Sequence, residues 1–199
     1  MRIQKAKGAD GVESNARLTG GVAALLLVLL AAEGVTLLSI HQLITLHVFI
    51  GMLLVPPVLL KVGSTGWRFV RYYRGSPPYR HKGPPPMVLR LLGPAVVILT
   101  AILFVSGIVL VFTHQSGHSQ LLFIHKASFV LWFAAMVIHV LGHIVETARL
   151  APLDWMRRTR REIAHAGART WAITVSVIAG VLLGVATWGH TGGFAHLGR

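Results

Sequence analysis

Three histidines of the chain fall inside long apolar stretches, where burying an imidazole costs free energy. They are His47, His125 and His139, out of eleven histidines in 199 residues. An ionisable side chain inside an apolar helix is costly to bury, so it usually has a partner or a functional role. The chain contains no cysteine, and imidazole suits iron, copper and zinc. We therefore treat these three residues as candidate ligands of a metal or of haem iron.

His47 and His125 are expected to lie at the same depth. His47 is about five residues inside one apolar stretch and His125 about four residues inside another, and both stretches run in the same direction. At ~1.5 Å rise per residue the two imidazoles reach similar height, so together they can supply both axial ligands of one haem b. Gly51 follows His47 by one helical turn on the same face. Its missing side chain would let a flat macrocycle approach the helix.

The spacing along the helices adds a second level. His125 and His139 are fourteen residues apart, which at ~100° per residue returns to the same face after ~21 Å of rise. Such a helix can present ligands to two stacked haems. Fourteen residues after His47 comes Lys61, so one haem and two haems both stay open: Lys61 is either a ligand or a cation that snorkels to the headgroups. Lys126, beside His125, is a candidate partner for a haem propionate.

These histidines also have plainer interpretations. A buried histidine is commonly a hydrogen-bonded core residue. His139 and His143 are four residues apart on one helix face, a spacing also found in zinc and copper sites, but the only acidic residue in that helix is Glu146. The histidines of the polar segments are expected to be solvated: His41, His114, His118, His190 and His196.

The elements that hold these residues are expected to cross a membrane. Hydrophobic residues make up 54% of the chain and charged residues only 13%, whereas soluble domains carry about 25% charged residues. Five stretches reach the ~20 apolar residues that a span needs: about 18–38, 42–62, 88–112, 121–146 and 170–189. The sequence therefore predicts an all-α integral membrane bundle of five transmembrane helices, namely a four-helix haem-binding core plus one helix.

The segments around this transmembrane domain, residues 18–189, are expected to be short. Residues 1–17 are predicted to be a loosely ordered tail, and residues 190–199 a tail on the other side. A surface helix is expected around Leu153–His165. Within the spans, two further features are expected: Pro56 and Pro57 should kink the second span, and Gly180 and Gly184 form a small-x-x-x-small pair suited to close helix contact.

Lysine and arginine give the orientation. They gather in residues 1–17, in residues 63–87 with Lys61 and Arg90 at the edges, and in residues 147–169. Five spans place these segments on one side, while the other side has only Lys126 and Arg199. The positive-inside rule then puts the N-terminus in the cytoplasm of a prokaryotic cell and the C-terminus outside its plasma membrane. The formal charge of +13 thus reflects topology, and no nucleic-acid partner is expected.

The first span has an alternative. Its basic start, apolar stretch and Ala31-Ala32 also fit a cleaved signal peptide. The length of the apolar stretch favours retention as a transmembrane helix, and cleavage would leave four spans in the same orientation.

The segments Leu46-His47-x-x-x-Gly51, His125 and Ile138-His139-Val-Leu-Gly-His143, set on a four-helix core, resemble bacterial di-haem cytochromes b of the cytochrome b561-like kind. The resemblance covers roughly residues 40–146. It implies haem b and membrane electron transfer with a quinone or a partner redox subunit. It assigns His47 and His125 to an outer haem and His139 to an inner one, with Lys61 where the other inner histidine is expected.

The expected function is therefore a b-type cytochrome that carries electrons to an extracytoplasmic acceptor. It would be the electron-transfer component of an oxidoreductase rather than an independent enzyme, in contact with lipid and with homo-oligomerisation left open. A histidine-lined transporter of a metal or small solute and a non-catalytic membrane subunit are the alternatives. A transporter should carry polar residues along several spans, but the third span has little beyond Thr100 and Ser106.

Overall fold

The computed structural model describes residues 2–83, 87–113, 120–154, 156, 159 and 164–190, except for the side chains of residues 2–9 and 82. Every regular element in these residues is helical, and five helices are long and apolar enough to cross a membrane. The predicted all-helical bundle with five spans is confirmed. The five long helices are α1 (Arg2–Leu37), α2 (Ile40–Tyr73), α4 (Met87–Thr113), α5 (Gln120–Leu150) and α7 (Ala166–Thr187). Two short elements, α3 (Pro77–Lys82) and η1 (Ala151–Asp154), follow α2 and α5.

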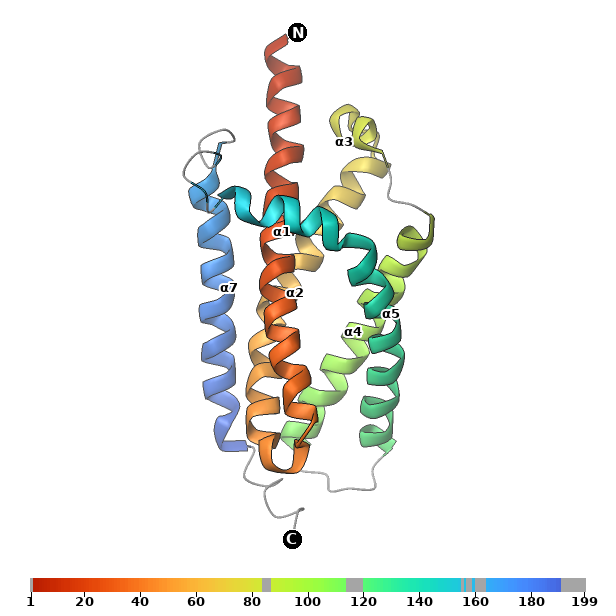
Figure 1. Ribbon diagram of the computed structural model, residues 1–199, viewed down its shortest axis with the longest axis vertical. Helices are drawn as coiled ribbons and strands as arrows, with labels where there is room; N and C mark the ends of the chain where they lie inside the picture. Colours follow the sequence, from red (N-terminus) through yellow and green to blue (C-terminus); the bar gives the residue numbers. More distant parts are fainter. Residues whose placement is uncertain are drawn as a thin grey trace.

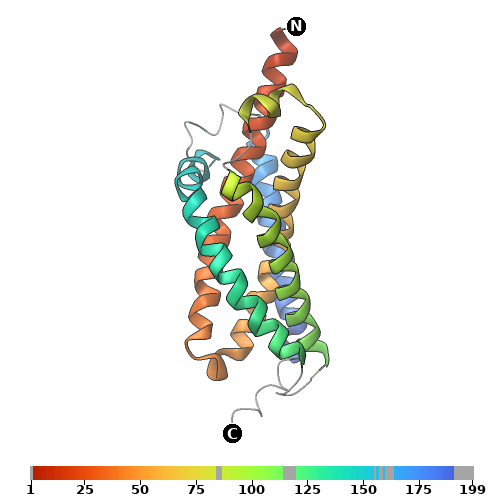
Figure 2. The ribbon, with the colours of Figure 1, turned by 90° about the vertical axis from the view of Figure 1, so that its right-hand side faces the viewer.

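The first four long helices form a ring of two hairpins (Figures 1 and 2). α1 packs along α2, α4 packs along α5, and the hairpins meet where α1 contacts α5 and α2 contacts α4. α2 and α5 are not among the closely packed pairs, so they lie diagonally across the ring. These two helices carry the candidate ligands His47, His125 and His139.

α7 lies outside the ring, against α2 and part of α1 (Figure 1). Its contact with α2 depends on two glycines. A methyl group on Gly180 would overlap the carbonyl oxygen of Leu53, and one on Gly184 would lie 2.7 Å from the ring of Phe49. The expected close contact at Gly180 and Gly184 is confirmed.

Two helix ends differ from the sequence expectation. α1 begins at Arg2, so the segment expected as a loose tail is helical, because it lacks proline and continues directly into an apolar helix, which costs less than starting a new helix. α2 runs on to Tyr73, eleven residues past its expected end, since no proline follows until Pro77. α2 is continuous through Pro56 and Pro57 and bends between its two halves (Figure 1).

The basic segments meet at one end of the bundle, which we call the basic end. The start of α1 lies there beside α3 and η1 (Figure 1). The surface helix expected around Leu153–His165 falls mostly outside the described residues, and its first residues belong to the 3-10 turn η1. The clustering of these segments on one side is what the counting of spans predicted.

An ion-pair cluster fixes the connector after α5 to α1 and α7. Asp154 accepts hydrogen bonds from Nε and Nη2 of Arg169, at 2.5 and 2.6 Å, and lies 3.7 Å from Nη1 of Arg17. Both arginine side chains are 4% exposed. Arg169 also donates to Ser14 Oγ at 2.9 Å. Asp154 therefore pairs with two buried guanidinium groups, and Arg17 has a second carboxylate partner in Glu13, whose Oε1 lies 3.1 Å from its Nε.

Replacing Asp154 by asparagine is expected to destabilise the fold by about 3 kcal/mol. The buried Arg169 would lose the carboxylate that it pairs with, and the buried Arg17 would lose one of its two carboxylate partners. Thermal unfolding of the purified protein in detergent measures the effect. The matched control is Asp10→Asn, since Asp10 is an exposed acidic residue of α1. An unfolding temperature of Asp154→Asn equal to that of the control would show that the cluster contributes nothing.

Candidate functional site

His47 is held by the last turns of α1. Its Nδ1 lies 2.9 Å from Oε1 of Glu33 and 3.0 Å from Oγ1 of Thr36. The Thr36 hydroxyl donates its only hydrogen to the carbonyl oxygen of Glu33, at 2.6 Å, so towards His47 its oxygen acts as an acceptor. Both neighbours of Nδ1 thus accept, which assigns the ring hydrogen to Nδ1 and leaves a lone pair on Nε2.

His125 is held in the same way by α4. Its Nδ1 lies 3.1 Å from the carbonyl oxygen of Leu103 and 3.0 Å from Oγ of Ser106. The Ser106 hydroxyl donates to that same carbonyl at 3.0 Å, so it too accepts from the ring. The hydrogen of His125 is therefore also on Nδ1, and Nε2 again keeps its lone pair.

The two hairpins repeat one arrangement. In each, a hydroxyl on the preceding helix bonds to the carbonyl three residues back and presents its oxygen to Nδ1 of a histidine on the next helix. Within the described part of the chain, neither Nε2 atom has a hydrogen-bond partner. An imidazole whose Nδ1 hydrogen is fixed by an oxygen acceptor, with Nε2 left open, is the form that binds metals.

His47 and His125 lie on two helices that do not pack closely against each other. Each imidazole is within electrostatic range of the other. Two imidazoles on opposite helices, each with an open Nε2, fit the axial ligation of a haem.

One glycine lies beside the His125 ring and another beside the carboxylate that holds His47. Gly51 lies beside Glu33, where an added methyl group would be 3.6 Å from Oε1. Gly107, on α4, is closer to a ring: its methyl group would be 3.0 Å from Cε1 and 3.4 Å from Nδ1 of His125. Gly51 was singled out from the sequence, whereas Gly107 was not, although Ser106-Gly107 is a small and polar pair in an otherwise apolar span.

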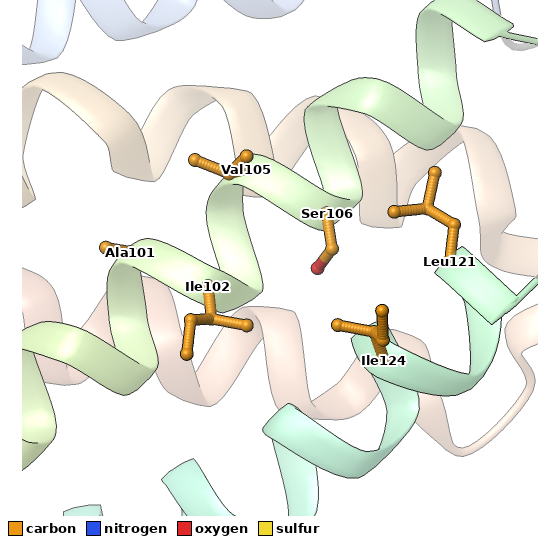
Figure 3. A pocket seen from close by; sticks show the side chains of 6 residues that line it. All are labelled: Ala101, Ile102, Val105, Ser106, Leu121 and Ile124. Carbon is orange, nitrogen blue, oxygen red and sulfur yellow. The ribbon is translucent and has the colours of Figure 1, made fainter.

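A groove of about 350 Å³ lies between α4 and α5 at this level. Figure 3 shows the hydroxyl of Ser106 pointing into it among aliphatic side chains. The groove is lined by Ala101, Ile102, Val105, Ser106, Leu121 and Ile124. Several of these aliphatic side chains are exposed, so in a bilayer hydrocarbon would fill the groove and keep the Ser106–His125 contact dry.

Two levels can be distinguished along the bundle. We call the level of His47 and His125 the outer level, and that of Lys61 and His139, nearer the basic end, the inner level. The inner level has a different chemistry. His139 lies close enough to Lys61 and to His143 for their charged forms to repel. Its Nδ1 is buried and has no hydrogen-bond partner in the described residues. Lys61 donates to the carbonyl oxygen of Thr19 on α1, at 2.9 Å, and feels the charge of Glu146. Lys61 thus lies within electrostatic range of His139 while its ammonium bonds to α1, and in the described part of the chain no hydroxyl orients His139.

Lys126 and His81 are more exposed than the three candidate ligands. Lys126 lies beside His125, and His81 lies on α3. His143 Nδ1 lies 3.6 Å from Oε2 of Glu146, yet among the described residues no group of three or more histidines and carboxylates is arranged to hold a metal ion. A zinc or copper site at His139 and His143 thus gains no third ligand there. Three loop and tail histidines lie outside the described residues: His114, His118 and His196.

No known protein family, no curated protein and no solved structure matches the chain. A function can therefore be argued only from the side chains that the fold brings together. The best-defined set consists of His47 and His125 with the oxygen atoms that lie within hydrogen-bond distance of their Nδ1 atoms.

Proposed function

We propose that the chain is a membrane b-type cytochrome that carries electrons, with His47 and His125 as the axial ligands of one haem b. The observation that carries the proposal is the repeated hydroxyl contact on Nδ1. It leaves an open Nε2 on each of two rings that lie near each other on diagonal helices. A histidine that only filled the core would be expected to use both ring nitrogens in hydrogen bonds.

One haem per chain is the better-supported stoichiometry. At the inner level, an ammonium stands in place of a second imidazole, and it is already bonded to the Thr19 carbonyl and near Glu146. The Nδ1 of His139 lacks an acceptor that would fix its hydrogen. We therefore assign His139 and Lys61 no iron in the chain as it stands.

The side chains around His47 and His125 have separate roles. When bound, the haem supplies the one-electron chemistry, and the protein supplies orientation, ligand strength and a dry environment. Thr36 and Ser106 hold the two rings in one tautomer. Gly107 leaves room for the His125 ring, and Gly51 leaves room beside Glu33, the partner of His47. Lys126, exposed one residue from His125, is placed to neutralise a propionate near the membrane surface.

The proposed redox partners follow from the position of His47 and His125 across the membrane. The basic end is assigned to the cytoplasm of a prokaryotic cell by the positive-inside rule, which puts His47 and His125 near the opposite surface. A membrane quinone or a partner redox subunit as donor, and an extracytoplasmic acceptor, are the natural couple. The first span is proposed to be retained, because α1 supplies Glu33 and Thr36 to the site.

The absorption spectrum of the purified protein tests the proposal. A reduced-minus-oxidised spectrum with a sharp α-band and a Soret peak, and a haem content near one per chain, is expected. A colourless protein that binds zinc or copper would support the histidine-lined transporter instead. A colourless and metal-free protein would support the non-catalytic subunit. The two polar side chains in the middle of α4 offer no transport path, because Thr100 and Ser106 are both buried and bonded to α5.

Replacing Gly107 by valine is expected to weaken haem retention about 10- to 100-fold, the usual effect of disturbing a residue that orients a ligand. The new side chain would enter the space of the His125 ring. Haem content after purification measures the loss. Gly93→Val is the matched control, because Gly93 lies on the same helix and has open space where a side chain would stand. Equal haem contents of the two variants would contradict the contact.

A further inference from the structure

The two histidines of the outer level are held alike except for one charge. Around His125 both acceptors are neutral, namely the Leu103 carbonyl and the Ser106 hydroxyl. Around His47 one of the two acceptors is the carboxylate of Glu33, whose Oε1 lies 2.9 Å from Nδ1. This difference cannot be read from the sequence, because Glu33 belongs to another helix than His47.

Glu33 occupies a place that needs explaining. Its side chain is 16% exposed on a helix that crosses the membrane, where a carboxylate is rare unless it is paired or functional. Its second oxygen, Oε2, is buried and has no hydrogen-bond partner among the described residues. The nearest hydroxyl, on Thr36, gives its hydrogen to the backbone. In the described structure, the Nδ1 hydrogen of His47 is therefore the one donor that this carboxylate engages.

We propose that Glu33 is a positioning residue that makes His47 the stronger electron donor of the two axial ligands and so lowers the reduction potential of the haem. The inference rests on the proposed function. A carboxylate that accepts the Nδ1 hydrogen raises the electron density on Nε2, as second-sphere carboxylates do for metal-bound histidines. More electron density at the iron stabilises the oxidised form relative to the reduced form. The two hairpins then contribute unequal ligands.

Replacing Glu33 by glutamine tests this, since it keeps the shape and an accepting oxygen but removes the charge. The midpoint potential of the haem, measured by redox titration in detergent, is expected to shift to a more positive value, with haem content unchanged. The spread of the electron paramagnetic resonance g-values should widen as the ligand weakens. The matched control is Asp10→Asn, which removes one negative charge from the same helix at an exposed position distant from Glu33 in the sequence, so its potential should stay close to that of the wild type.

A second pair of variants repeats the comparison with a shorter side chain. Between Glu33→Asp and Glu33→Asn, the asparagine variant is expected to have the more positive potential. A Glu33→Gln protein that keeps its haem at the wild-type potential would overturn the inference and leave the cytochrome proposal intact. A wild-type protein without haem would overturn the cytochrome proposal itself, so the two failures are distinguishable.

Discussion

The low-spin haem spectrum is expected to disappear when either His47 or His125 is replaced by alanine. Each ring is held by the preceding helix of its own hairpin with Nε2 open, so each supplies one axial position that no other described imidazole is placed to fill. Loss of one ligand leaves at most a five-coordinate, high-spin haem that is weakly held. The absorption spectrum and haem content of protein purified from membranes measure the change.

Three other alanine substitutions serve as controls for this result. His41 and His81 are exposed, and His139 belongs to the level that is assigned no iron, so all three variants should keep the wild-type spectrum. Membrane insertion, followed by the yield of protein in the membrane fraction, should be the same for all five. If the variants at His47 and His125 both retain a full low-spin spectrum, the ligand assignment is wrong.

Replacing Lys61 by histidine is expected to raise the haem content from one to two per chain. Lys61 stands fourteen residues after His47, which is ~21 Å along the helix on the same face, and it lies within electrostatic reach of His139. The substitution removes the ammonium bonded to Thr19 and offers an imidazole in its place. The ratio of haem to protein and a second wave in a redox titration report the new site.

The double variant Lys61→His with His139→Ala should return the ratio to one, because the second site then lacks its α5 ligand. Lys61→Met, which removes the charge without adding an imidazole, should also stay at one. An unchanged ratio in the single histidine variant would count against the equivalence of the two levels. That result would not affect the assignment of His47 and His125 as the ligands of one haem.

The spans could be predicted from the sequence because a membrane demands ~20 apolar residues per helix, and composition alone reveals such stretches. The helix ends could not be predicted in this way. The start of α1 at Arg2 and the end of α2 at Tyr73 lie in polar sequence, where no apolar pattern marks them. There, a helix ends only where proline, glycine or a capping residue stops it.

The site was predicted in part for a related reason. A fixed rise per residue places His47 and His125 at equal depth and Lys61 opposite His139 without knowledge of any contact. Their partners could not be found this way, since the turn of α1 that meets His47 depends on how the hairpin packs. Thr36 and the role of Glu33 were missed for that reason. Ser106 was noted only as a rare polar residue in its span.

The most direct test of the central claim is electron paramagnetic resonance of the oxidised wild-type protein, combined with its haem-to-chain ratio. Two imidazoles that coordinate one iron should give a single low-spin signal typical of two histidine ligands, at one haem per chain. A protein without haem, or a haem whose signal is high-spin, would mean that the Nε2 atoms of His47 and His125 do not meet on one iron.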